Sequence, residues 1–171
     1  MSVPEVMAED RSGLEVDTDK AAGLAVALLV RLGFCGGELG VTFVTAGEME
    51  QLNHAFMGRE ESTDVLSFPL DAEAMELETG FGEEMEAEEQ EMLAGLLLGG
   101  ASEEVPLLLG DVVICPEVAA ARAPQNGNSL DEELCLLLIH GILHVSGYDH
   151  EIDEGEMEAL QEKLFREMCR S

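Results

Sequence analysis

The fold prediction rests first on the stretch SLDEELCLLLIHGILHVSGYDH, residues 129–150. Ser129 and Glu132 have the Ser-x-x-Glu spacing of a capping box, which predicts the start of a helix. Apolar residues follow almost without interruption, so we expect this helix to continue through residue 145. Gly147 predicts its end, because glycine adopts the left-handed backbone of helix C-termini at little cost.

Three of the chain's four histidines lie at the end of this stretch, as His140, His144 and His150. Two histidines four residues apart on a helix share one face, one turn apart, which is the geometry that a shared metal ion needs. The turn at Gly147 can bring His150 back toward the other two. Three neutral imidazoles suit zinc and leave a fourth position for a water molecule that the ion activates at neutral pH. We therefore predict one zinc ion on these three residues.

Other interpretations of these histidines stay open. A closed structural zinc site would need a fourth protein ligand, which Cys135 or Cys169 could supply in principle. Cys135 lies five residues before His140, on a different face of the helix, and this counts against it. Simple packing of histidines in a core is disfavoured, because three of them fall within eleven residues at regular spacing. The fourth histidine, His54, is predicted to be an ordinary surface residue, with a place near the substrate cleft as the alternative.

The spacing HxxxHxxGxxH is that of the metzincin proteases, so a zinc cradle of that type is expected here. In those enzymes the residue after the first histidine is a glutamate, which is the general base of peptide hydrolysis. This chain has Gly141 at that position. A protease would lack its proton acceptor, and we therefore expect a different reaction class on a similar metal cradle.

Helices and strands mix upstream of this stretch. Asp17, Thr18 and Asp19 offer N-caps for a helix through about residue 31, and its residues 21–30 are apolar nearly all round, so we predict that they lie deep in the core. Residues 40–45 are β-branched and aromatic, which favours a strand. Thr45 and Glu48 then have the spacing of a second capping box, and the helix they open should end at Gly58.

The remaining elements complete the fold prediction. Residues 64–70 predict a strand, whose proline favours a sheet edge or a strand end. Residues 110–115 predict a short buried strand, and residues 116–122 a helix that begins with proline. Asp153 and Glu156 should open a last helix. Because strands and helices do not alternate strictly, the class is α+β, with a mixed, mostly parallel β-sheet packed among five to six helices.

The length and charge of the chain limit the number of domains and the kinds of partner it can bind. A chain of 171 residues is expected to form a single domain, with residues 71–107 as an inserted excursion that holds twelve acidic residues and no basic one. The whole chain has 37 acidic residues against 8 basic ones, a net charge of −29. Broad binding to nucleic acid or to anionic lipid depends on Lys and Arg, so both are disfavoured. An RNA partner must be held locally.

The sequence also bears on cellular location. Its longest apolar run, residues 21–30, is too short to cross a bilayer, and the N-terminus lacks the basic start and apolar core of a signal peptide. The four cysteines are scattered without a Cys-x-x-Cys pair, which predicts reduced and mostly buried thiols in a cytoplasmic protein. They are Cys35, Cys115, Cys135 and Cys169.

A family resemblance joins three blocks of the chain. HGILHVSGYDH matches the pattern H-G-x-L-H-x-x-G-Y-D-H, and STDVLSFP (residues 62–69) and GDVVIC (residues 110–115) agree with two further blocks in the right order. On these residues the chain resembles the YbeY family of metal-dependent endoribonucleases and ribosomal RNA maturation factors. The resemblance covers residues 41–70 and 110–165.

The resemblance implies a function. It implies a zinc-dependent endoribonuclease specific for single-stranded RNA that acts in 16S ribosomal RNA 3′-end maturation and ribosome quality control. His140, His144 and His150 would be its zinc ligands and part of its catalytic site. The implied partners are ribosomal RNA, the small ribosomal subunit and basic ribosomal proteins, with no DNA and no membrane. The family fold places the metal site in a cleft at the edge of the sheet.

The chain departs from the family pattern beside the second block. Where the family has Tyr-Arg-Gly, the sequence reads Phe56-Met57-Gly58, so Met57 occupies the position of the functional arginine. Arg59, two residues on, is the candidate to neutralise charge on a phosphate. Phe68 could stack on an RNA base or lie in the core, and the core is favoured.

Two other functions compete with RNA cleavage. One is a metal-dependent hydrolase of another substrate, including peptides, against which the missing glutamate at position 141 counts. The other is a non-enzymatic ribosome-assembly factor in which zinc only stabilises the C-terminal half.

If the chain is the endoribonuclease, we expect Ser67 to line the cleft and Asp149 to orient a ligand histidine or cap the turn.

Overall fold

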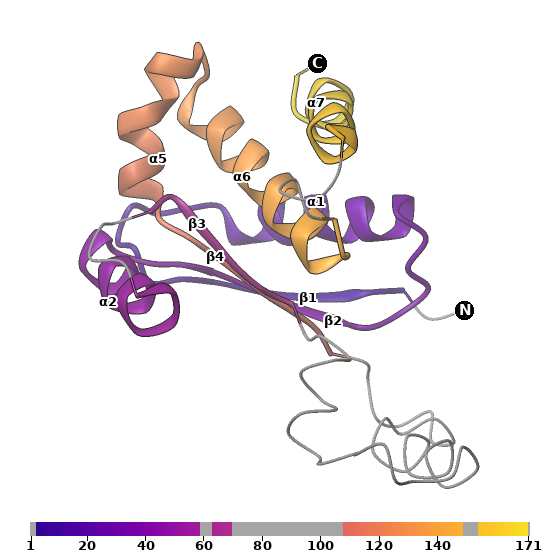
Figure 1. Ribbon diagram of the computed structural model, residues 1–171, viewed down its shortest axis with the longest axis horizontal. Helices are drawn as coiled ribbons and strands as arrows, with labels where there is room; N and C mark the ends of the chain where they lie inside the picture. The colour runs from indigo at the N-terminus through magenta and orange to yellow at the C-terminus, as the bar shows by residue number, and fades with distance from the viewer. Residues whose placement is uncertain (1–2, 59–62, 70–107, 149–153, 171) are drawn as a thin grey trace, which may run out of the picture.

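A four-stranded mixed sheet forms the centre of the molecule (Figure 1). The computed structural model describes residues 3–58, 63–69, 108–148 and 154–170. Three strands run parallel and the fourth, at one edge, runs antiparallel, which confirms the predicted mixed, mostly parallel sheet. In sheet order the strands are β1 (Glu5–Asp10), β2 (Glu38–Phe43), β4 (Leu108–Ile114) and β3 (Val65–Pro69).

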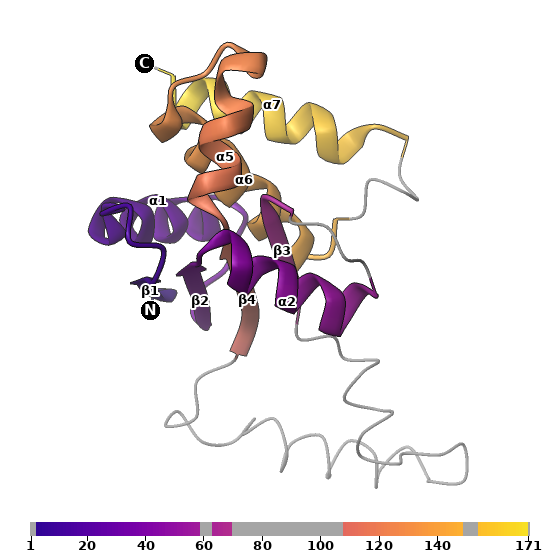
Figure 2. The same cartoon turned by 90° about the vertical axis from the view of Figure 1, so that its left-hand side faces the viewer.

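Helices cover the two faces of the sheet unequally, as Figures 1 and 2 show together. The larger core packs one face of the sheet against α1, α5, α6 and α7, whereas α2 covers part of the opposite face through a smaller cluster around Met49 and Leu66. The helix count within the described residues agrees with the five to six predicted. The helices are α1 (Thr18–Arg31), α2 (Ala46–Met57), α5 (Pro116–Arg122), α6 (Leu130–Val145), α7 (Glu156–Met168) and the short 3-10 helix η1 (Ala123–Asn126).

The first strand, β1, was not predicted from the sequence. It pairs in parallel with β2, from Glu5 opposite Glu38 to Asp10 opposite Phe43. Its residues alternate between exposed and half-buried, which is the two-residue period of a strand with one covered face. The pattern is weak because the outward Met7 is 73% exposed, so apolar residues occupy both faces. Pairing with β2 therefore stabilises a strand that the sequence pattern barely indicates.

The prediction that residues 21–30 lie deep in the core is wrong. Asp17 caps α1 as expected, but only Ala25, Leu28 and Leu29 are buried, and Val30 is 52% exposed. The helix packs on one side against β1 and α6, while its other side faces outward.

None of the helices in the described part of the chain has the length and hydropathy of a membrane-spanning segment.

Of the two capping boxes that the sequence predicts, one is complete in the structure. Ser129 and Glu132 form the predicted reciprocal box at the start of α6. Thr45 accepts the Glu48 backbone N–H at 3.2 Å, but the Glu48 carboxylate forms an ion pair with Arg11 at 3.2 Å instead of completing the box. Helix α7 begins after Gly155, a left-handed cap (φ 95°), and not after Asp153, which lies outside the described residues.

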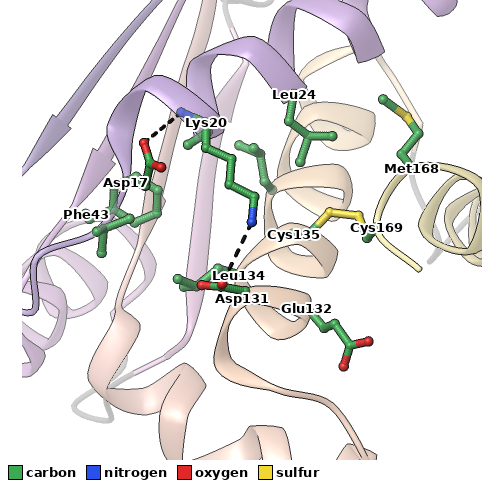
Figure 3. A pocket seen from close by; sticks show the side chains of 13 residues that line it. Asp17, Lys20, Leu24, Phe43, Asp131, Glu132, Leu134, Cys135, Met168 and Cys169 are labelled. Atoms are coloured by element: carbon green, nitrogen blue, oxygen red, sulfur yellow. Dashed lines mark hydrogen bonds and ion pairs between the residues drawn. A yellow bond between two sulfur atoms is a disulfide. The ribbon is translucent and has the colours of Figure 1, made fainter. Parts of the chain in front are cut away.

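The prediction of four reduced cysteines is also wrong. Cys135 on α6 and Cys169 at the end of α7 form a disulfide across 34 residues, with their Cα atoms 6.2 Å apart. Figure 3 shows it at the wall of a pocket of about 370 Å³ between α1, α6 and α7. Cys35 is an exposed thiol, and Cys115 is a buried one whose pKa burial raises. The bond was missed because only helix packing brings the two cysteines together.

Candidate functional site

Helix α6 packs closely against the sheet at a glycine between the two described histidines. A Cβ atom on Gly141 would lie 2.5 Å from Cγ1 of the buried Val112 on β4 and 3.2 Å from Oγ of Ser67 on β3. Ser67 also donates its hydroxyl to the Gly141 carbonyl at 3.3 Å. Position 141 therefore faces the sheet, where a glutamate side chain has no space. Packing thus gives a reason for the absence of the glutamate found in metzincins.

His140 and His144 lie together at the end of α6, as the sequence predicted. Their Nε2 atoms are 3.1 Å apart, and their rings meet edge to face with centroids 4.6 Å apart. Both side chains are half-buried. Zinc–nitrogen bonds of 2.0–2.1 Å in a tetrahedral site hold two nitrogens about 3.3 Å apart. The spacing of these two atoms therefore fits a shared zinc ion.

A third side chain, Gln161 on α7, contacts this pair and was not predicted. Its Oε1 lies 2.7 Å from Nδ1 of His140. Met157 and Leu164, four residues before it and three after, are buried on the same face of α7. A polar residue within an apolar helix face is the sequence signal that could have identified Gln161.

The other predicted site residues are only partly described. His150, Arg59 and Asp149 lie outside the described residues, so their roles stay predictions. Within the described part of the chain, no group of three His, Cys, Asp or Glu side chains could hold a metal. The disulfide consumes Cys135 and Cys169, which removes both from the set of possible zinc ligands.

Helix α2 ends next to the site's predicted arginine position. Met57 is its last residue, and Gly58 ends it in the left-handed conformation (φ 67°), as predicted. His54 is exposed on this helix, in agreement with the expected surface position. The chain therefore leaves α2 at Gly58, directly before Arg59.

An aromatic pair lies at the edge strand β3. The rings of Phe56 on α2 and Phe68 on β3 meet edge to face, with centroids 5.2 Å apart. Phe68 packs against the smaller core cluster and is half-buried, which supports the favoured core position. Phe56 is 64% exposed, so the pair presents one open aromatic ring. Ser67, the residue before Phe68 on β3, donates a hydrogen bond to Gly141 on α6.

The sequence is similar to known proteins over most of its length. The family model described as Endoribonuclease YbeY matches residues 14–169. A protein named Endoribonuclease YbeY from Salinispora tropica is 42% identical over 158 residues, which cover 91% of this chain and 90% of the relative. One of the same name from Micrococcus luteus is 38% identical over 164 residues, covering 93% and 88%.

The fold is also found in a solved structure. The solution structure of a protein from Thermotoga maritima superposes with a TM-score of 0.55 at 27% sequence identity. The match covers 95% of this chain and 88% of that one. The arrangement of α6 on the mixed sheet therefore belongs to a fold already seen by experiment.

Proposed function

The chain belongs to the Endoribonuclease YbeY family, and on that premise we propose that it is a zinc-dependent endoribonuclease that cleaves single-stranded RNA. The observation that carries the metal part of this proposal is the His140–His144 pair, with Nε2 atoms 3.1 Å apart on one face of α6. The donor set is imidazole, which suits zinc, and the close approach at Gly141 fixes the helix that carries it.

Three histidines would hold the ion: His140, His144 and, from the turn after α6, His150. When bound, zinc would polarise a phosphoryl oxygen of the RNA and activate water or the neighbouring 2′-hydroxyl for attack. Arg59 is the candidate to neutralise charge that develops on the phosphate, because its guanidinium can contact two oxygens at once. Gly141 keeps α6 against the sheet, so the two described imidazoles project from a rigid base.

A preference for single strands is supported by the aromatic pair at β3. Unpaired bases expose their faces and stack on aromatic side chains, whereas bases in a duplex are already stacked. The open ring of Phe56, supported by Phe68, offers such a surface. It needs no positive charge, which suits a chain with a net charge of −29.

We further propose that the substrate is ribosomal RNA, with action in 16S 3′-end maturation and ribosome quality control in the cytoplasm. The acidic residues 71–107 favour basic protein partners, and proteins of the small ribosomal subunit are basic. The charge of residues 71–107 and the family support this substrate, which presupposes the cleavage activity proposed above.

The test combines metal analysis with RNA cleavage for wild type and His144→Ala. We expect about one zinc ion per wild-type chain and cleavage of an unstructured RNA, and loss of both in His144→Ala. His54→Ala is the matched control, because it removes an exposed histidine on another helix. Salt should be varied, since binding through few phosphate contacts predicts a shallow salt dependence.

Other results would favour the competing functions. A His144→Ala protein that holds no metal but still cleaves RNA would contradict the proposal. A wild type that binds zinc and ribosomal subunits but cuts no RNA would point to an assembly factor. Cleavage of unstructured peptides would point to another hydrolase, although the packing at Gly141 leaves no space for a glutamate base.

A further inference from the structure

Gln161 occupies an unusual place on α7. It lies on the helix face that packs toward α6, where Met157 is 1% exposed and Leu164 is 2% exposed. Gln161 itself is half-buried, and the water that its side chain loses there costs free energy unless a hydrogen bond replaces it. Its Oε1 has that partner in Nδ1 of His140, at 2.7 Å. An apolar residue would satisfy packing alone, so the polar group needs another explanation.

The contact has a consequence for the proton on His140. A neutral imidazole carries hydrogen on one ring nitrogen and a lone pair on the other. Oε1 of Gln161 faces Nδ1 of His140, and because an amide oxygen only accepts hydrogen bonds, we assign the hydrogen to Nδ1. The lone pair then lies on Nε2, the atom that is 3.1 Å from Nε2 of His144. This is the tautomer that can bind a metal between the two histidines.

We propose that Gln161 is a positioning residue, which holds His140 in the tautomer and ring orientation that a metal at the α6 site requires. The inference rests on the proposed function, because it takes His140 as a ligand. It adds a residue from a different helix, so the site depends on how α7 packs against α6. Hydrogen-bond partners of ligand histidines generally change metal affinity by about 10–100-fold when removed.

The experiment compares two substitutions at position 161. Gln161→Met is similar in length, suits the apolar face and removes the acceptor, while Gln161→Glu keeps an acceptor oxygen. Glu162→Met is the matched control, because it makes the same kind of change at an exposed neighbouring position. Each protein is labelled with ¹⁵N-histidine and treated with a chelator. Long-range ¹H–¹⁵N spectra then report which nitrogen of each imidazole carries hydrogen.

We expect the Nδ1–H form of His140 in wild type, Gln161→Glu and Glu162→Met, and a shift toward the Nε2–H form in Gln161→Met. In a competition assay with a coloured chelator, zinc should bind Gln161→Met about 10–100-fold more weakly than wild type. The thermal midpoint of metal-free Gln161→Met should equal or exceed that of wild type, since methionine fits the apolar face. Weaker binding with an intact fold separates positioning from a general structural role.

The two possible failures are distinguishable. If Gln161→Met keeps both the Nδ1–H tautomer and the zinc affinity of wild type, this inference is overturned and the proposed function stands. If the wild type itself binds no zinc, the proposed metal site is overturned, and the role of Gln161 toward it as well. The spectra of the metal-free protein show whether Nδ1 of His140 carries the hydrogen that the bond to Gln161 requires. This result does not depend on zinc binding.

Discussion

Two of the contacts between helices α6 and α7 differ in kind. Near the C-terminus of α7 the Cys135–Cys169 disulfide forms a covalent joint, beside the pocket drawn in Figure 3. Eight residues earlier on α7, the hydrogen bond between Gln161 and His140 forms a polar joint. The covalent joint restricts the unfolded chain and serves stability, whereas the polar joint orients an imidazole. One helix pair thus separates stability from site geometry along its length.

The largest effect on stability is expected at the covalent joint. Cys135→Ser with Cys169→Ser should lower the free energy of unfolding by about 3–4 kcal/mol, because the closed loop spans 34 residues. Urea unfolding measures the loss, and reduction of wild type should reproduce it. Zinc affinity should stay within about threefold of wild type if the two joints are independent. Cys35→Ser, which removes an exposed thiol, is the control.

A large loss of zinc affinity in the double serine variant would contradict the independence of the covalent and the polar joint. It would mean that the disulfide sets the spacing on which the Gln161–His140 contact depends. An unchanged unfolding free energy would show instead that the bond contributes no net stability.

A smaller loss of stability, with a larger effect on the site, is expected from Gly141→Ala. The new Cβ would lie 2.5 Å from Cγ1 of Val112, and overpacking of this kind costs about 1–3 kcal/mol. Because α6 must move away from the sheet, zinc affinity should fall as well. Thermal unfolding and zinc titration measure the two effects.

Gly23→Ala on α1 is the matched control for that change. No atom lies within 4 Å of a Cβ built on Gly23, so this exposed helical glycine should gain about 1 kcal/mol from alanine's helix propensity. Equal effects of the two substitutions would show that Gly141 is not needed for close packing. Adding Val112→Ala to Gly141→Ala should recover part of the lost affinity if the clash is the cause.

The smallest effect is expected from Arg170→Ala, close to the disulfide. Arg170 donates from Nη2 to Oδ1 of Asn128 at 2.6 Å, lies 5.0 Å from the centre of the Phe165 ring, and forms an ion pair with Glu132 on α6 at 3.7 Å. These contacts are partly exposed, so the loss should be about 0.5–1 kcal/mol with zinc affinity unchanged. Arg166→Ala, an exposed neighbour on α7, should change less. A change in zinc affinity for Arg170→Ala would contradict the separation of the two joints.

Local signals in the sequence predicted most of the elements. The capping box at Ser129, the proline at the start of α5 and the glycine after α2 act within a few residues, and each has the predicted place. The His140–His144 pair was predictable for the same reason, because helix geometry alone brings residues four apart onto one face. Strand β1 was missed because its pairing with β2 outweighs a weak pattern of its own.

Local spacing and the alternation of apolar residues were enough to predict most of the elements, the mixed class of the sheet and the paired imidazoles on α6. Tertiary structure alone decided which residues from distant segments meet. It joined Cys135 to Cys169, set Gln161 against His140, and pressed Gly141 against Val112. The physical reason is that such contacts depend on how whole helices pack, and helix packing is the sum of many weak side-chain interactions that no short motif encodes.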